Sequence, residues 1–134
     1  MSGPSGPIRL LLVDDEPGYL EVLEKRLSRR GVEVTPALGG GEAIQALRGQ
    51  DFEVAVVDLK MQDMDGIDVL KVLKKMEPKL AVIILTGHGS EQAARDGLEQ
   101  GAFDYLTKPC DLEKLLERIK AAHASSGGDR GGSD

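Results

Sequence analysis

Three carboxylates follow apolar runs of this sequence, each at the point where a run ends. Asp14 and Asp15 come directly after residues 8–13, and Asp58 comes directly after residues 54–57. If the two runs are neighbouring strands, the three acids lie in one crevice, where their repulsion raises the pKa of at least one of them. A hard divalent cation offsets such a charge, and Mg²⁺ favours a few carboxylates, a backbone carbonyl and several waters. The pattern therefore predicts a Mg²⁺ site.

Two further side chains complete a set that could transfer a phosphoryl group. Thr86 ends the apolar run 81–86, and Lys108 follows the short run 104–107. A lysine offers positive charge to phosphoryl oxygens, and a hydroxyl offers a hydrogen-bond donor. With a carboxylate as nucleophile and a metal beside it, positioning and charge neutralisation supply most of the catalysis. The candidate catalytic residues are therefore Asp58, Thr86 and Lys108.

The elements that must position these residues alternate along the chain. Continuous or alternating apolar runs predict strands, and the segments between them carry apolar residues at helical spacing. Strands are expected at 8–13, 32–35, 54–58, 81–86 and 104–107, and helices beginning near residues 17, 43, 66, 91 and 112. This alternation predicts an α/β fold with a single doubly wound parallel sheet, flanked by five helices. The flavodoxin-like strand order 2-1-3-4-5 is the common five-stranded arrangement, with a crevice between strands 1 and 3.

Capping residues and glycines mark the ends of several elements. Asp65, Ser90 and Asp111 stand at the expected starts of the last three helices, where a side-chain oxygen can cap the helix. The glycine triplet at 39–41 lacks the lysine ending of a phosphate-binding loop, so we expect a turn there. Gly97 interrupts a helix with a small apolar face, which predicts weak attachment of this helix.

Length and composition bound the organisation of the chain. Its 134 residues fit one domain at 8–124, with a disordered lead at 1–7 and a disordered tail or linker start at 125–134. The net charge of −6 argues against direct contact with nucleic acid, because phosphate binding needs a basic face. Cys110 is the only cysteine, so no intramolecular disulfide can form, which fits a cytoplasmic location. No apolar run is long enough to span a membrane.

Taken together, the residues that could do chemistry resemble a known signalling family. Their order is Asp14-Asp15, Asp58, Asp65-Gly66, Thr86 and Lys108-Pro109. This pattern is similar to that of the response-regulator receiver domain of bacterial two-component signalling. The resemblance covers about residues 8–124, and its strength comes from the several motifs in order at strand ends, since each motif alone is weak.

The resemblance implies a role for each residue of the pattern. Asp58 would be the phosphoacceptor, and Thr86 and Lys108 would hold the phosphoryl oxygens. Three carboxylates and one backbone carbonyl would bind Mg²⁺, those of Asp14, Asp15, Asp58 and Lys60. The Lys108-Pro109 peptide bond would be cis, an isomer essentially confined to proline.

The resemblance also implies partners and a switch. A sensor histidine kinase or a phosphotransfer protein would donate the phosphoryl group. Thr86 would then move inward and Tyr105 would follow, which would alter the face formed by helix 91–100, the last strand and the last helix. That face would bind a downstream protein, a missing output domain or a second copy of the chain. The chain would be a signalling phosphoacceptor and no enzyme beyond its own phosphorylation and dephosphorylation.

Three positions near the expected site depart from the family pattern or vary within it. Gln62 stands where the family often has proline, so we expect a more flexible loop at 59–64 and a lower affinity for metal. Lys60 and His88 each lie two residues past a site residue, at positions that in this family tune hydrolysis of the phosphoaspartate. The direction of that tuning stays open.

Other classes of protein fit the sequence less well. A flavodoxin-type flavin binder needs a hydroxyl-rich loop after the first strand, where this chain has acids and a proline. A phosphatase with an aspartyl nucleophile needs a second acid two residues after the first, where this chain has Lys60. The remaining alternative is a receiver-like docking module that works without phosphorylation. The intact set of acids argues against it, and only Gln62 supports it.

Overall fold

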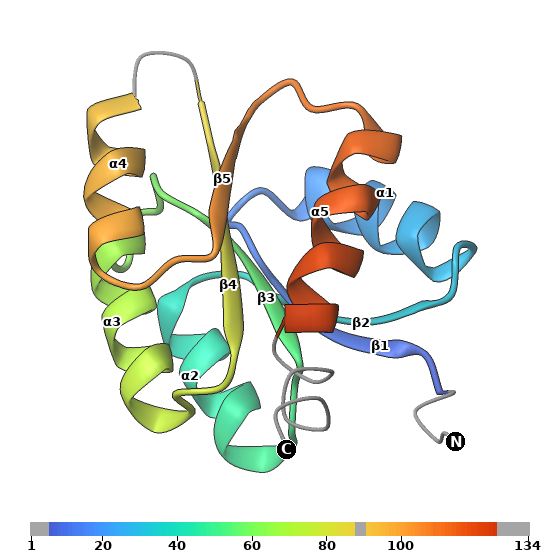
Figure 1. The fold of residues 1–134 in the computed structure, drawn as a ribbon, viewed down its shortest axis with the longest axis horizontal. Coiled ribbons are helices and arrows are strands. Elements are labelled where there is room, and N and C mark those ends of the chain that lie inside the picture. The colour runs from blue at the N-terminus through green and yellow to red at the C-terminus, as the bar shows by residue number, and fades with distance from the viewer. Residues whose placement is uncertain (1–5, 88–90, 126–134) are drawn as a thin grey trace.

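Strands and helices alternate along the chain and form a five-stranded parallel sheet with helices on both faces (Figure 1). The computed structural model describes residues 6–87 and 91–125. The strands are β1 (Ile8–Val13), β2 (Val32–Ala37), β3 (Val54–Asp58), β4 (Ala81–Thr86) and β5 (Asp104–Thr107). The helices are α1 (Pro17–Ser28), α2 (Gly40–Gly49), α3 (Gly66–Met76), α4 (Glu91–Glu99) and α5 (Leu112–His123). The strand order β2-β1-β3-β4-β5 confirms the doubly wound, flavodoxin-like sheet.

The register of the sheet brings the ends of its strands to one edge. Val57 of β3 pairs with Val13 of β1, and Thr86 of β4 pairs with Thr107 of β5. All four pairings are parallel, so the residues that follow these strands emerge on the same side. In open parallel sheets, ligands bind in the crevice at this edge.

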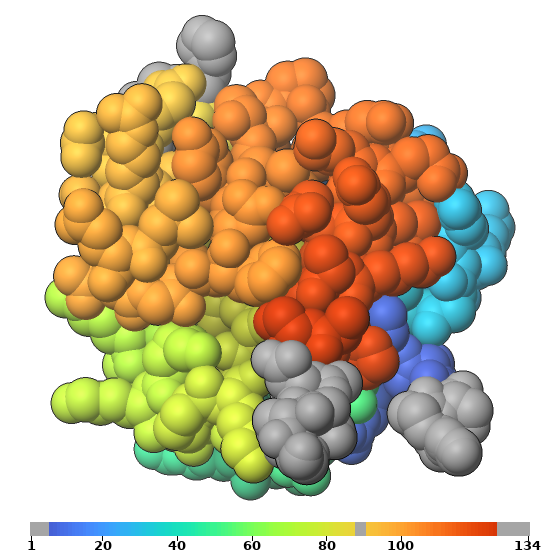
Figure 2. Space-filling view, viewed as in Figure 1, coloured from blue at the N-terminus to red at the C-terminus, as the bar shows by residue number. Residues whose placement is uncertain are grey.

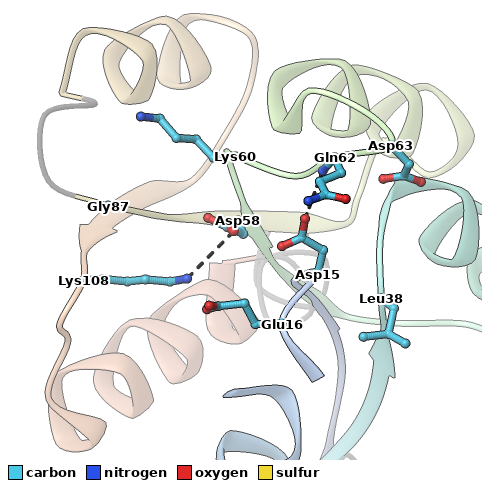
Figure 3. Close-up of a pocket in the computed structure, with 9 residues that line it drawn as sticks. All are labelled: Asp15, Glu16, Leu38, Asp58, Lys60, Gln62, Asp63, Gly87 and Lys108. Atoms are coloured by element: carbon cyan, nitrogen blue, oxygen red, sulfur yellow. Dashed lines mark hydrogen bonds and ion pairs between the residues drawn. The ribbon is translucent and has the colours of Figure 1, made fainter. Parts of the chain in front are cut away.

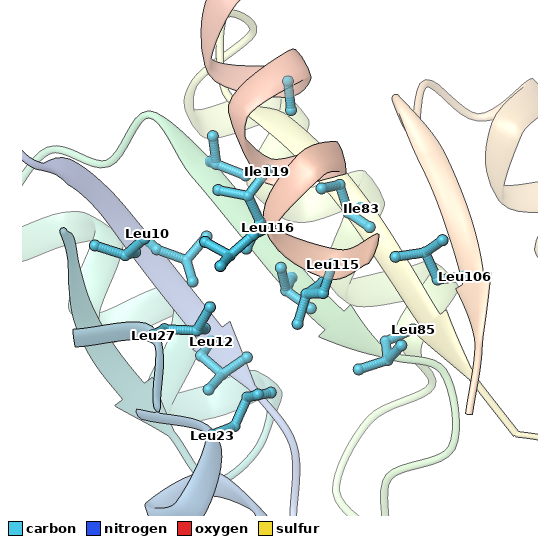
Figure 4. Packing of buried hydrophobic residues seen from close by; sticks show 14 of the residues in the cluster. Leu10, Leu12, Leu23, Leu27, Ile83, Leu85, Leu106, Leu115, Leu116 and Ile119 are labelled. Carbon is cyan, nitrogen blue, oxygen red and sulfur yellow. The ribbon is translucent and has the colours of Figure 1, made fainter. Parts of the chain in front are cut away.

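Two apolar clusters, one on each face, hold the sheet between its helices. Alternate residues of a strand point to opposite faces. Accordingly, Leu10 and Leu12 of β1 pack with α1 and α5, whereas Leu11 and Val13 pack with α2, α3 and α4. Figure 4 shows the first cluster, in which side chains of α5 lie over the central strands. Because both faces are covered, every residue of β3 is buried, as its continuous apolar run predicts.

The starts of the helices match the expected caps only in part. The Asp65 side chain accepts a hydrogen bond from the Ile67 amide at 2.8 Å, which confirms the cap of α3. Asp111 occupies the expected N-cap position of α5, but its side chain makes no capping hydrogen bond there. The expected turn at 39–41 is wrong, since α2 begins at Gly40. Ser90 lies outside the described residues.

Helix α4 packs on the sheet through small residues. Its buried residues are Ala94 and Gly97, and Leu98 is 39% exposed. A Cβ atom on Gly97 would overlap the side chain of Ile84 on β4, so glycine is what allows the helix to lie this close. The residue expected to weaken the helix is therefore part of its contact with the sheet, while the mobility of α4 stays a prediction.

Several expectations fall on the chain ends and on a short segment before α4. Residues 1–5, 88–90 and 126–134 lie outside the described part, and with them most of the expected lead and tail, as well as His88. Within the described ranges, no helix has both the length and the apolar character needed to cross a membrane. The chain folds back on itself so that α5 lies beside α1 and against β4 (Figures 1 and 2).

Candidate phosphoacceptor site

A pocket of about 660 Å³ opens at the carboxyl ends of the strands (Figure 3). It lies beside the switch point of the sheet, where β1 and β3 are neighbours. Most of the side chains around it are polar or charged, and they come from the ends of β1, β3 and β5 and from the loop after β3. Its lining includes Asp15, Asp58, Lys60, Gln62, Asp63 and Lys108.

The structure brings the three acids of the sequence pattern together. Asp14 and Asp58 are only 2% and 7% exposed, and Asp15 lies at the pocket. One carboxylate oxygen from each of the three lies within 4.8 Å of the others. Their positions follow from the register, because Asp14 and Asp15 come after β1 and Asp58 ends the adjacent β3. Carboxylate oxygens at this spacing suit a hard divalent cation.

Lys108 provides the positive charge of the site. Its Nζ donates a hydrogen bond to Asp14 Oδ2 at 2.9 Å and lies 3.8 Å from Asp58 Oδ2. It also lies 4.5 Å from the centre of the Tyr19 ring, a cation–π contact. Burial by itself lowers the pKa of Lys108, but the hydrogen bond and charge of Asp14 outweigh it, and the pKa is raised. The ammonium is therefore held between two carboxylates and an aromatic ring.

Asp58 has the most perturbed carboxyl group of the site. Its pKa is raised to about 6, mainly by burial and also by the negative charge of Asp14, against the opposing effects of Lys108 and the Lys60 backbone. Lys108 thus does not fully offset the negative charge of the three neighbouring carboxylates. A hard dication would offset this charge and lower the pKa of Asp58, so the donor set fits Mg²⁺.

Thr86 and Tyr105 lie next to the acids along the sheet. Thr86 is 1% exposed, and among the described residues its Oγ1 makes only a long contact of 3.5 Å, with the Gly87 carbonyl oxygen. The Thr86 carbonyl accepts a 2.7 Å hydrogen bond from the Lys108 amide, which joins the ends of β4 and β5. Tyr105 is half-buried against the cluster that includes Ala94 of α4. Their switch role stays a prediction.

The loop after β3 is tied to its surroundings at both sides of the pocket. The Gln62 amide donates to Asp15 Oδ2 at 2.9 Å. The Asp63 carboxylate accepts hydrogen bonds from the Gly40 and Gly41 amides, each at 3.0 Å, and these two bonds lower the pKa of Asp63. These contacts form without the proline that the family often has at position 62. In Figure 3 the side chain of Lys60 points away from Asp15, while its backbone stays at the pocket.

Gly66 fixes the far end of the same loop. Its amide donates to the Leu59 carbonyl oxygen at 2.9 Å, so the first residue of α3 lies directly on the backbone that follows Asp58. A Cβ atom on Gly66 would come within 2.5 Å of Leu59 Cα and 2.6 Å of the Asp58 carbonyl oxygen. Only glycine permits this approach. The Lys108–Pro109 peptide bond, at the end of β5, is cis.

Sequence reasoning missed two residues that support the site. Tyr19 left no signal beyond an aromatic residue in the first turn of the helix after Asp15. Asp63 binds partners 22 and 23 residues away in the sequence, so no local pattern pointed to it. One signal was available: a helix whose N-cap residue is glycine has no side chain of its own to cap it, and its amides need an outside acceptor.

Comparison with known proteins agrees with this geometry. The family described as the response regulator receiver domain matches residues 10–120. The transcriptional regulatory protein GlrR of Escherichia coli (strain K12) is 40% identical over 116 residues, which are 87% of this chain and 26% of that protein. The DNA-binding transcriptional regulator NtrC of Proteus hauseri is 38% identical over 83% of this chain and 24% of its own length. The chain thus spans about a quarter of these relatives.

Solved structures agree in fold. A response regulator receiver domain protein from Clostridium thermocellum has a TM-score of 0.83 and 35% identity, and the match covers 87% of this chain and 94% of that one. NtrX from Brucella abortus, solved in complex with ADP, has a TM-score of 0.89 and 28% identity over 95% of this chain and 29% of that one. With the strand-end acids and lysine in place, the chain belongs to the family of response regulator receiver domains.

Proposed function

We propose that the chain is the phosphoacceptor of a two-component phosphorelay and that Asp58 receives the phosphoryl group. The observation that carries the proposal is the position of Asp58, which ends β3 at the pocket, 3.8 Å from Lys108 Nζ and clustered with Asp14 and Asp15. A carboxylate beside a fixed cation and a candidate metal site has the parts that phosphoryl transfer needs. The donor would be the phosphohistidine of a sensor kinase or of a phosphotransfer protein.

The proposed reaction is an in-line displacement at phosphorus. An oxygen of Asp58 forms a bond to phosphorus while the bond from phosphorus to the histidine nitrogen breaks, and its electron pair returns to the imidazole. Lys108 is held by Asp14 at 2.9 Å, so its ammonium is already in place for the charge of the transferred oxygens. Thr86 is proposed to donate its hydroxyl to another of these oxygens. Fixed donors of this kind need no rearrangement during the reaction.

The proposed metal ligands are the carboxylates of Asp14, Asp15 and Asp58 and the backbone carbonyl of Lys60. Mg²⁺, when bound, would neutralise the acids and the incoming phosphoryl oxygens. The support for this assignment is the raised pKa of Asp58 and the spacing of the three carboxylates within 4.8 Å. The buried Asp14 also accepts a hydrogen bond from the Glu16 amide at 3.0 Å, which orients it.

Phosphorylation is proposed to act through the face formed by α4, β5 and α5. Tyr105 of β5 and Ala94 of α4 belong to one packed group, so a shift of Thr86 followed by Tyr105 reaches the helix. On the other side of β5, Arg118 of α5 binds Asp104 at 2.7 Å. The relatives GlrR and NtrC are transcriptional regulators about four times as long as this match. An output domain or a separate protein is therefore the proposed recipient of the signal.

The test is the intact mass of the protein after incubation with Mg²⁺ and acetyl phosphate, a small phosphodonor. We expect one added phosphoryl group on the natural chain and none on Asp58→Ala. Addition to both proteins would place the acceptor elsewhere. No addition to either protein, with no binding of Mg²⁺, would favour a receiver-like docking module that works without phosphorylation.

A further inference from the structure

The glycine triplet at 39–41 and the loop after β3 pack closely against each other. A Cβ atom on Gly39 would come within 2.6 Å of Asp63 Oδ1, and one on Gly40 would come within 2.6 Å of Met64 Sδ. Gly41 is less crowded, with Asp63 Oδ2 at 3.6 Å from such an atom. At Gly39 and Gly40, a residue with a side chain would therefore collide with the loop.

The Asp63 carboxylate joins these two segments by hydrogen bonds. Its two oxygens accept from the amides of Gly40 and Gly41, each at 3.0 Å. Both amides belong to the first turn of α2, where backbone donors have no partner within the helix. The N-cap residue is glycine and makes no side-chain cap, so Asp63 supplies the acceptor from another part of the chain.

The same loop carries groups that face the acids. The Gln62 amide donates to Asp15 Oδ2 at 2.9 Å, and the Lys60 backbone lies near enough to Asp58 to lower the pKa of that carboxyl group. Asp63 is the next residue after Gln62, so its attachment to α2 constrains the peptide that holds Asp15. Met61 and Met64 pack against the apolar cluster, but Gln62 and Asp63 between them are exposed, so hydrogen bonds are what hold these two residues.

We propose that Asp63 is a positioning residue: by binding the amides of Gly40 and Gly41 it fixes the loop 59–64 and thereby the Asp15 carboxylate and the Lys60 carbonyl. The inference rests on the proposed Mg²⁺ site. It predicts that the affinity for Mg²⁺ depends on the contact between Asp63 and α2, although Asp63 is not itself a proposed ligand. Groups that orient metal ligands in this way commonly affect affinity strongly.

The first test removes one donor of the contact without changing any charge. In Gly41→Pro the amide proton is lost, and proline is tolerated in the first turn of a helix. Gly41→Ala is the matched control, because it keeps the amide and its Cβ would meet Asp63 at an ordinary 3.6 Å. The readouts are hydrogen exchange of the Gln62 amide in metal-free protein and Mg²⁺ titration followed by NMR.

We expect Gly41→Pro to speed exchange at Gln62 by about tenfold and to weaken Mg²⁺ binding by about tenfold relative to Gly41→Ala. Unchanged exchange and affinity in a folded Gly41→Pro protein would overturn the proposal, because Asp63 would then only cap α2. A natural chain that binds no Mg²⁺ would instead overturn the proposed metal site, and the exchange measurement would still decide whether Asp63 orders the loop.

A second variant guards against poor folding of Gly41→Pro. Asp63→Asn keeps the size of the side chain and places an amino group against one of the two amides, but it also removes a negative charge near the metal site. Glu16→Gln measures that charge effect, since Glu16 also lines the pocket. We expect Asp63→Asn to weaken Mg²⁺ binding several-fold more than Glu16→Gln. Equal losses would reduce the role of Asp63 to its charge and overturn the proposal.

Discussion

The two sides of the pocket are held by different means. Asp14, Asp58, Thr86 and Lys108 form a strand-held side, whose first three members are 2%, 7% and 1% exposed. Asp15 and the loop 59–64 form a loop-held side, which depends on hydrogen bonds such as those of Asp63 with α2. The backbone hydrogen bonds of the sheet and the apolar core fix the strand-held side. The loop-held side depends on single exposed hydrogen bonds, which typically contribute about 1 kcal/mol each. Asp58 and Lys108 are thus held by the sheet, whereas Asp15 and the Lys60 carbonyl, two of the four proposed metal ligands, lie on the side that depends on hydrogen bonds.

Among these variants, Gly66→Ala should lower the stability of the protein most, because its side chain would push α3 away from the backbone at Asp58 and Leu59. The added methyl would come within 2.5 Å of Leu59 Cα, and backbone cannot yield as a side chain does. We expect the free energy of unfolding to fall by about 3 kcal/mol, measured by urea denaturation. Gly18→Ala is the control, since a Cβ there meets nothing within 4 Å, and no loss is expected.

Asp58→Asn probes the cost of crowding charge on the strand-held side. The carboxylate is buried and its pKa is raised to about 6, so its ionised form destabilises the metal-free fold at neutral pH. The neutral amide should raise the free energy of unfolding by about 1–2 kcal/mol at pH 7.5 in EDTA. Lower stability in the variant would contradict this account of the acid cluster.

Tyr19→Leu tests whether the ring helps to place Lys108. The ring centre lies 4.5 Å from Lys108 Nζ, and a cation–π contact of this kind is worth about 1 kcal/mol. Phosphorylation by acetyl phosphate should therefore slow by about fivefold, measured as mass gain over time. Tyr19→Phe keeps the ring and should slow the reaction less than Tyr19→Leu. Equal rates for Tyr19→Leu and Tyr19→Phe would show that the aromatic ring does not help to place Lys108.

Asp63→Asn should have the smallest effect on stability, and this effect should be present at neutral pH and disappear in acid. The Gly41 and Gly40 amides lower the pKa of Asp63 in the folded state below its usual range. The stability from these bonds is present above the unfolded pKa and is lost as pH falls through the folded pKa. Between pH 5 and pH 3 the unfolding free energy of Asp63→Asn should therefore fall less steeply than that of the natural chain. Parallel curves would contradict this.

The sequence predicted the strand-held side because its signals are local. A buried strand in a parallel sheet needs a continuous apolar run, and the residue after the run lies at the pocket edge. Asp14, Asp58 and Thr86 follow that rule, and the family and the strand order predicted from the whole pattern are confirmed. Their individual roles in phosphoryl transfer stay predictions.

The loop-held side could not be predicted because its contacts join distant segments. The bond between Asp63 and Gly40 spans 23 residues, and neither segment alone indicates the other. The triplet at 39–41 predicts a turn because it lacks the lysine of a phosphate-binding loop, yet close packing against Met64 and an outside cap make Gly40 the first residue of α2. The close approach of Gly97 to Ile84 was unpredictable for the same reason, because that contact belongs to the tertiary structure.

The hydrogen bond between Lys108 and Asp14 also bears on how the protein becomes competent as it is made. The two residues are 94 positions apart, and Lys108 comes after the last strand. A growing chain that has emerged only as far as β4 carries all three acids without their cation. Contacts this far apart in sequence form late, because the chain between them must first be ordered. If Asp58 accepts a phosphoryl group as proposed, a chain that ends before Lys108 should not be phosphorylated, and phosphorylation would therefore report that β5 has joined the sheet.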